Sequence, residues 1–112
     1  MTNFEDSEFN CPCCGENKMD WEFLLLLDRA REIALVPFVI NSGYRCPNHN
    51  DEVGSTSRNH VEGKAADIAC TNGWKRLRII RALMGVGFQR IGIHKEFIHV
   101  DSMDSAASMW VY

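Results

Sequence analysis

Two histidines and an aspartate occupy positions from which they can bind one metal ion. His60 lies seven positions before Asp67, and His99 follows in a later apolar run. Imidazole nitrogens and carboxylate oxygens are ligands of Zn²⁺, and a catalytic zinc has three protein ligands and keeps its fourth position for water. Water in that position reacts with amides and esters near neutral pH. The three residues therefore predict a small zinc hydrolase.

Length and charge limit the other functions that this chain can have. With 112 residues and 46% apolar content, residues 1–112 are expected to form one domain around one core. The net charge is −3 and charges of both signs are interspersed, which disfavours nucleic acid as a partner. No apolar run is long enough to span a bilayer, so we expect no membrane insertion. We also expect a monomer.

Apolar residues recur at helical spacing in two segments. The first helix is expected from Asp20, a candidate N-cap, to residue 34, and the second over residues 73–84. A shorter helix is expected over residues 48–53. The residues predicted to face inward are Trp21, Leu24, Leu25, Ile33 and Leu35 in the first helix, and Trp74, Leu77, Ile80, Leu83 and Met84 in the second.

Short β-branched and apolar runs between turn signals predict the strands. They cover residues 38–40, 65–70, 90–94, 97–101 and 109–112, and residues 1–18 are expected to be irregular. Helices and strands alternate without a βαβ repeat. The expected fold class is therefore α+β, with a mostly antiparallel sheet and flanking helices.

The hairpin formed by the third and fourth strands is expected to turn at residues 95–96. This turn pairs Ile93 with Ile98. In the same register Ile91 lies opposite Val100, so four β-branched side chains share the core face. The other face carries His94, Phe97, His99 and Asp101. A slip by one residue would bury polar groups and expose the apolar ones, at a cost of several kcal/mol.

The strand over residues 65–70 is expected to place its carboxylate beside this polar face. Asp67 shares a face with Ala65 and Ala69, whose small side chains leave room for a metal. His60 precedes the strand in a glycine-containing loop that can fold back over Asp67. Asp101 is expected to accept the second N–H of a ligand histidine, which fixes the tautomer of that ring.

Several motifs taken together resemble those of the M15 zinc peptidases. This family includes D-Ala-D-Ala carboxypeptidases and phage endolysins that cut the stem peptides of peptidoglycan. The resemblance covers about residues 10–112 and implies a hedgehog/DD-peptidase type of fold with one catalytic zinc bound by His60, Asp67 and His99. The matching motifs are Ser42-Gly-Tyr-Arg45, His49-Asn50, His60-x-x-Gly63-x-Ala65-x-Asp67-Ile68, Phe97-Ile-His99-Val-Asp101 and Trp110-x-Tyr112.

The resemblance also implies catalytic residues. Arg45 is expected to bind the oxyanion or a substrate carboxylate. Glu96 and His94 lie where different relatives place a catalytic carboxylate or histidine. We expect both in the site, with Glu96 favoured as the base and His94 as a donor to the transition state. Relatives often carry a serine two positions before the first zinc histidine, where this chain has Arg58, so the nearby Ser57 becomes the candidate for contact with substrate.

The implied function is zinc-dependent hydrolysis of a bond in a peptidoglycan stem peptide. D-Ala-D-Ala carboxypeptidase and L-Ala-D-Glu endopeptidase activities both fit the sequence. The acidic N-terminus lacks the features of a signal peptide, so cytoplasmic synthesis is expected, with action on the cell wall after release or as part of a phage particle. The alternative is a non-catalytic, zinc-stabilised module that binds peptidoglycan or belongs to a virion.

Cysteines gather in the irregular N-terminal segment. Cys11 and Cys14 form a C-P-x-C-G motif of the kind that presents two thiolates to zinc. Cys46 and His49 form a C-x-x-H pair, so a second, structural zinc ion bound by these four residues is one hypothesis. A disulfide between the N-terminal cluster, which includes Cys13, and Cys46 is another, and free thiols are the third.

Overall fold

The structure, a computed structural model, describes residues 2–112 and contains four helical segments and five strands. The segment predicted to be irregular includes a short 3-10 helix. The helices are η1 (Asp6–Phe9), α1 (Trp21–Ala34), α2 (Pro47–Glu52) and α3 (Gly73–Gly85). The strands are β1 (Ile40–Ser42), β2 (Ala65–Ala69), β3 (Arg90–Ile93), β4 (Phe97–Asp101) and β5 (Ser108–Val111).

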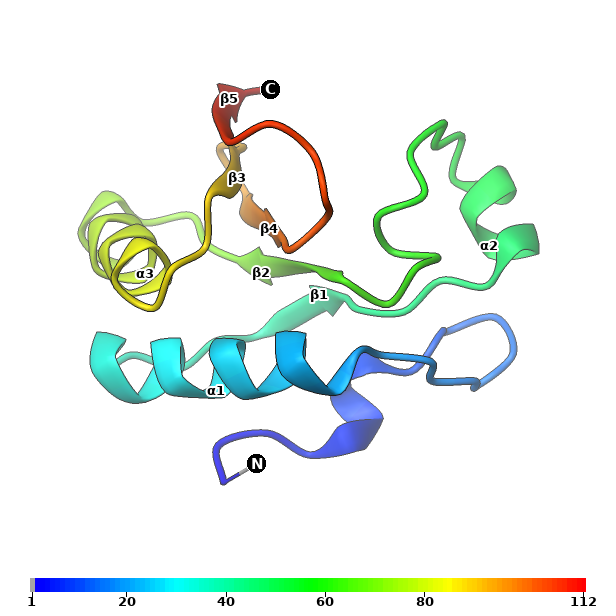
Figure 1. The fold of residues 1–112 in the computed structure, drawn as a ribbon, viewed down its shortest axis with the longest axis horizontal. Coiled ribbons are helices and arrows are strands. Elements are labelled where there is room, and N and C mark those ends of the chain that lie inside the picture. Colours follow the sequence, from blue (N-terminus) through cyan, green and yellow to red (C-terminus); the bar gives the residue numbers. More distant parts are fainter. Residues whose placement is uncertain (1) are drawn as a thin grey trace.

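The five strands form one sheet in the order β1-β2-β4-β3-β5. All neighbouring strands are antiparallel except β3 and β5, which are parallel. This confirms the predicted α+β class with a mostly antiparallel sheet. Figure 1 shows α3 and α2 on opposite sides of the view, with the sheet between them. None of the helices in the described part of the chain combines the length and the apolar character needed to cross a membrane.

Helices α1 and α3 pack against each other and cover one face of the sheet. The strands contribute Ile68, Ile91, Ile98 and Val100 to this core, each no more than 2% exposed. The predicted hairpin register is confirmed, because Ile93 pairs with Ile98 and Ile91 pairs with Val100. Alternation along the strands therefore directs their polar side chains to the opposite face.

The inward faces predicted for the two long helices are largely wrong. Trp21, Leu25, Ile33 and Leu35 of the first stripe are exposed, as are Trp74, Leu77 and Met84 of the second. The buried residues are Phe23, Leu24, Leu27, Ala30 and Ala34 in α1, and Ile79, Ala82 and Leu83 in α3. Alanines on these faces let the two helices approach closely, and the larger apolar residues are left on the outside.

Local signals set the ends of the elements more accurately. Asp20 caps α1 as predicted, because its carboxylate accepts a hydrogen bond from the backbone N–H of Phe23 at 3.0 Å. Asn72 caps α3 in the same way through the N–H of Lys75. The first strand was predicted too early. Phe38 is buried in the core, but the sheet pairing begins at Ile40 and continues to Ser42.

Candidate metal centre

The polar face of the sheet brings Asp67 and His99 together. Strands β2 and β4 pair antiparallel, and Asp67 lies directly opposite His99 in the register. Nδ1 of His99 is 3.0 Å from Oδ1 of Asp67. Residues from two strands far apart in the sequence therefore meet on the face that α1 and α3 leave free.

A loop between α2 and β2 brings His60 to the same place. Nδ1 of the His60 ring lies 2.8 Å from the carbonyl oxygen of Gly43, and its Nε2 lies 3.5 Å from Oδ1 of Asp67. The loop is held close to the start of α1, because the N–H of Asp20 donates to the carbonyl of Gly63. Gly63 has a φ of +72°, and a Cβ there would collide with the carbonyl of Lys18, so only glycine fits.

The three side chains meet the requirements of a divalent metal site. One ligand atom each from His60, Asp67 and His99 lie within 4.8 Å of one another. A neutral imidazole that donates through one nitrogen presents a lone pair at the other. His60 donates from Nδ1 to a carbonyl, which leaves Nε2 facing Asp67. His99 has Nε2 against Asp101 at 2.7 Å, which leaves Nδ1 facing Asp67. The donor set and its orientation fit zinc.

Asp101 orients His99, and three hydrogen-bond donors fix the Asp101 carboxylate in turn. Its carboxylate accepts hydrogen bonds from Asn59 Nδ2 at 3.1 Å, Arg90 Nε at 2.7 Å and the backbone N–H of Met103 at 3.1 Å. Asp101 is only 1% exposed, so these donors replace the water that its charge has lost. The predicted contact between Asp101 and a ligand histidine is present in the structure.

Charges within this network shift the pKa values of its members. Burial alone would raise the pKa of Asp67, but hydrogen bonds and charge interactions with the two imidazoles hold it below the usual value. Burial likewise opposes ionisation of Asp101, while His99, the Met103 N–H and Arg90 lower its pKa. For His99 burial acts to lower the pKa, and the hydrogen bonds to Asp101 and Asp67 raise it instead. Both carboxylates are therefore ionised at neutral pH.

The three candidate ligands lie in a cavity of about 450 Å³. Its walls are lined by three aromatic residues and by five polar or charged ones, which are Arg45, Ser55, Ser57, Asn59 and Arg90. Arg45 is half-buried, and among the described residues its Nε has no hydrogen-bond partner. The aromatic residues are Phe97, Trp110 and Tyr112. The cavity thus combines a candidate metal site, the side chain of Arg45 and apolar walls.

A family model described as Peptidase M15 matches residues 2–101 of this chain. The chain belongs to the peptidase M15 family. Membership implies a metallopeptidase, and the convergence of His60, Asp67 and His99 agrees with that class. No curated protein matches the sequence.

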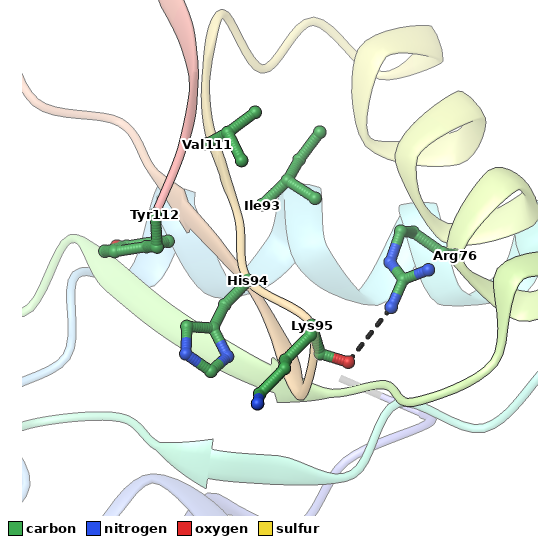
Figure 2. Close-up of a pocket in the computed structure, with 6 residues that line it drawn as sticks. All are labelled: Arg76, Ile93, His94, Lys95, Val111 and Tyr112. Carbon is green, nitrogen blue, oxygen red and sulfur yellow. Dashed lines mark hydrogen bonds between the residues drawn. The ribbon is translucent and has the colours of Figure 1, made fainter.

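Two of the predicted catalytic residues of this M15 protein do not line the cavity. Glu96 is exposed in the turn between β3 and β4, and its N–H donates to Nδ1 of His94. The His94 ring stacks on Phe97 at 4.4 Å and meets the edge of Tyr112 at 5.7 Å. Figure 2 shows His94 in a neighbouring pocket that is also lined by Arg76 and Tyr112. Phe97 and Tyr112 line the metal cavity themselves, so His94 lies next to its aromatic wall.

Several residues that build the cavity had no role in it assigned from the sequence. Asn59 and Arg90 hold Asp101, and Asn50 of α2 donates from Nδ2 to the carbonyl of Ser57 at 2.9 Å, which fixes the loop carrying that serine. Trp110 enters the wall because β5 pairs in parallel with β3, which places Trp110 beside Gly92. A glycine in an otherwise β-branched strand was the available signal, since it marks close approach of another group.

The cysteines form a second cluster of metal-binding groups. Sulfur atoms of Cys11, Cys14 and Cys46 lie within 4.8 Å of one another, while His49 lies in a separate group with Cys13 and Glu52. The structure therefore brings together three of the four ligands proposed for a structural zinc. All five cysteines of the chain are free thiols in the structure.

Proposed function

We propose that this M15 protein is a zinc-dependent peptidase that hydrolyses a bond in the stem peptides of peptidoglycan. The observation that carries the proposal is the convergence of His60 Nε2, His99 Nδ1 and the Asp67 carboxylate in a cavity large enough for a peptide segment. D-Ala-D-Ala carboxypeptidase and L-Ala-D-Glu endopeptidase activities remain the two candidate reactions, acting in cell-wall lysis.

Zinc bound by these residues would polarise the scissile carbonyl and lower the pKa of a water molecule to about 7. The protein supplies the remaining interactions. Arg45 is half-buried in the cavity wall, and its Nε has no hydrogen-bond partner among residues 2–112, so its guanidinium suits a substrate carboxylate or the oxyanion of the tetrahedral intermediate. Both candidate substrates carry such a carboxylate near the bond that is cut, because each bond adjoins either a chain terminus or a D-glutamate.

Arg45→Ala is expected to lower kcat/KM for peptide hydrolysis by about 100- to 1000-fold, the usual cost of removing one oxyanion donor. Arg58→Ala is the matched control, because Arg58 is exposed in the loop between α2 and β2 and pairs there with Glu62 on the surface. Zinc content should not change in either variant. Equal rates for the two variants would exclude a role for Arg45 in the reaction.

Three residues are candidates for proton transfer during hydrolysis, namely Glu96, His94 and Tyr112. Glu96 and His94 remain the predicted base and donor, and either role requires the β3–β4 turn to move toward the cavity when substrate binds. Tyr112 already lines the cavity, and partial burial raises the pKa of its hydroxyl, which keeps it protonated as a donor at neutral pH. Glu96→Gln should retain zinc and lose most turnover; near-normal turnover would transfer the base role to His94.

Digestion of purified peptidoglycan tests the proposal. The wild-type protein should release new amino termini, a chelator should abolish this release, and added zinc should restore it. Mass spectrometry of the released fragments then identifies the bond, because each candidate reaction gives a product of different mass. Release that no chelator affects would refute zinc catalysis.

A non-catalytic peptidoglycan-binding or virion module is the second candidate function. The observation in its favour is that Glu96 and His94 lie outside the residues that line the metal cavity. Sedimentation with insoluble peptidoglycan, without any release of amino termini, would support this alternative. We also propose that the protein acts as a monomer on the cell wall, after release from the cell or as part of a phage particle, by analogy with the family.

A further inference from the structure

Three of the five cysteines meet at one place outside the peptidase cavity, and a fourth lies beside one of them. Cys11, Cys13 and Cys14 come from the segment between η1 and α1, and Cys46 directly precedes α2. Sulfurs of Cys11, Cys14 and Cys46 are mutually within 4.8 Å, and the sulfur of Cys13 is 3.9 Å from that of Cys46. The peptidase reaction proposed above uses none of these thiols.

One pair of these sulfurs, Cys13 and Cys46, has the spacing expected in a tetrahedral metal site. With zinc–sulfur bonds of about 2.3 Å, two sulfurs of a tetrahedral site are separated by about 3.8 Å. The distance of 3.9 Å between Cys13 and Cys46 is close to this value. A disulfide has a sulfur–sulfur bond of about 2.05 Å, so these sulfurs are not bonded to each other. Any single disulfide would also leave the other two thiols of the cluster unpaired.

The backbone around the cluster supports negatively charged sulfur. The N–H of Cys46 donates to Cys11 Sγ, and the N–H of His49 donates to Cys46 Sγ, both at 3.4 Å. The chain reverses after Cys11 through a hydrogen bond from the N–H of Gly15 to the Cys11 carbonyl at 2.8 Å. Gly15 has a φ of +76°, which glycine adopts without strain. This turn presents Cys11 and Cys14 to the same point.

We propose that Cys11, Cys13, Cys14 and Cys46 bind a structural zinc ion. Four sulfur ligands close the coordination sphere, so this ion stabilises the fold and leaves no position for substrate. Cys13 is assigned as the fourth ligand because its sulfur approaches Cys46. His49 lies beside Cys13 and Glu52, with one ligand atom of each within 4.8 Å of the others and 3.7 Å between its Nδ1 and a carboxylate oxygen of Glu52.

The proposed ion would join two parts of the chain, the segment between η1 and α1 and the residues just before α2. No helix or strand lies between η1 and α1, and the apolar cluster at this point consists of Cys11, Tyr44 and Cys46 with Met19 packed against them. Arg45 lies between two of these residues and lines the peptidase cavity. The ion would therefore fix the backbone on both sides of Arg45 and support the substrate side of the cavity from outside.

The number of zinc ions per chain gives the first test, by native mass spectrometry of protein purified under reducing conditions. The wild-type protein should carry two ions, Cys14→Ser one, and the matched variant Cys70→Ser two, because Cys70 lies at the end of β2 away from the cluster. Equal zinc content in Cys14→Ser and the wild-type protein would overturn the proposal. This readout does not depend on peptidase activity, so the two proposals fail separately.

Thiol reactivity of the wild-type protein gives a second test that needs no variant to fold. Cys11, Cys13, Cys14 and Cys46 should resist alkylation in the zinc-loaded protein and become reactive together when a chelator is added. Cys13 and Cys14 are exposed, so without a metal the reagent can reach both thiols. Rapid alkylation of both before chelation, or a disulfide found by peptide mapping of freshly purified protein, would overturn the proposal.

Two further variants identify the fourth ligand. Cys13→Ser should lose the second zinc ion, and His49→Gln should retain it. The opposite pattern would overturn the assignment of Cys13 and place an imidazole in the fourth position. Cobalt substitution gives an independent readout, because absorption from thiolate-to-metal charge transfer should weaken in Cys13→Ser and remain unchanged in His49→Gln.

Discussion

The two clusters of metal-binding groups in this protein differ in almost every physical respect. His60, Asp67 and His99 project from a sheet and a loop into an open cavity, and they offer two nitrogens and a carboxylate. The cysteine cluster, Cys11, Cys13, Cys14 and Cys46, lies between an irregular segment and a short helix and offers only sulfur. The first arrangement leaves space for solvent and substrate, and the second surrounds its centre.

The supports of the two clusters differ as well. In the cavity, Asp101 and the carbonyl of Gly43 orient the two imidazoles, and the strand register fixes Asp67 opposite His99. The cysteine cluster depends on backbone N–H groups and on a few apolar contacts. A site carried by strands can be rigid before metal binds, whereas a loop-borne site gains order from the metal.

Of the variants considered, Asp67→Ala should show the largest difference between the two clusters in zinc binding. It removes the ligand that both imidazoles face, so zinc should leave the cavity site and peptide hydrolysis should fall to background. The zinc of the cysteine cluster should stay. Metal analysis and amino-group release measure both effects, with Asp51→Ala in α2 as an exposed control. Full activity in Asp67→Ala would remove the basis of the comparison.

Asp101→Asn leaves the candidate metal ligands in place and weakens only the group that orients one of them, His99. The variant loses the charge that pairs with Arg90 and His99, and zinc affinity in the cavity should fall by about 10- to 100-fold. Competition with a chromogenic chelator measures this affinity. Asp104→Asn, an exposed carboxylate in the same region, should have no effect. An unchanged affinity in Asp101→Asn would show that the tautomer of His99 is set elsewhere.

Gly92→Ala tests how closely the wall of the cavity is packed. A Cβ on Gly92 would lie 2.5 Å from Nε1 of Trp110, so the indole must move away from its place 5.5 Å from the His99 ring. Overpacking of this kind costs about 1–3 kcal/mol and should lower stability and kcat/KM together. Gly85→Ala is the control, because a Cβ there meets no atom within 4 Å. Equal melting temperatures would show that the wall adapts freely.

The pH dependence of stability is expected to reverse when metal is removed from the cavity. In the metal-free protein the lowered pKa values of Asp67 and Asp101 stabilise the fold above their ordinary range, and this contribution is lost as the pH falls through the folded values. The raised pKa of His99 stabilises the fold below about 6.5, and this contribution is lost as the pH rises through its folded value.

Metal-free protein should therefore melt at a higher temperature near pH 5.5 than near pH 8, within the window of about 4 to 6.5 where all three groups are charged. Zinc-loaded protein should show the opposite order, because protons compete with zinc for the imidazoles. Thermal melting at the two pH values, with and without a chelator, measures both orders. The same order in both forms would contradict the proposed network.

The sequence predicted the strands of the site better than the helices that support them. In the hairpin, one register buries Ile91, Ile98 and Val100 while the other exposes them. The large difference in free energy between the two registers selects the first. Helix α1 has apolar residues on nearly every side, and the stripe containing Trp21 competed with the one that is buried. The alanines at positions 30 and 34 marked the true contact face, because they are the residues that permit close helix packing.

The remaining parts of the site depend on contacts that no local pattern encodes. Pairing of β2 with β4 and of β3 with β5 joins segments distant in sequence, and the parallel β5 strand places Trp110 against Gly92. Glu96 and His94 were assigned from the positions of similar motifs, whereas their distance from the cavity depends on how the turn folds. Metal ligands are constrained more tightly by chemistry than proton donors are, so their types alone are more informative.

Anomalous diffraction at the zinc edge from crystals of zinc-loaded protein shows whether His60, Asp67 and His99 bind one zinc ion. We predict a strong peak at bonding distance from Nε2 of His60, Nδ1 of His99 and a carboxylate oxygen of Asp67. Absence of this peak in fully loaded protein, or a zinc ion bound through Nε2 of His99, would contradict the account.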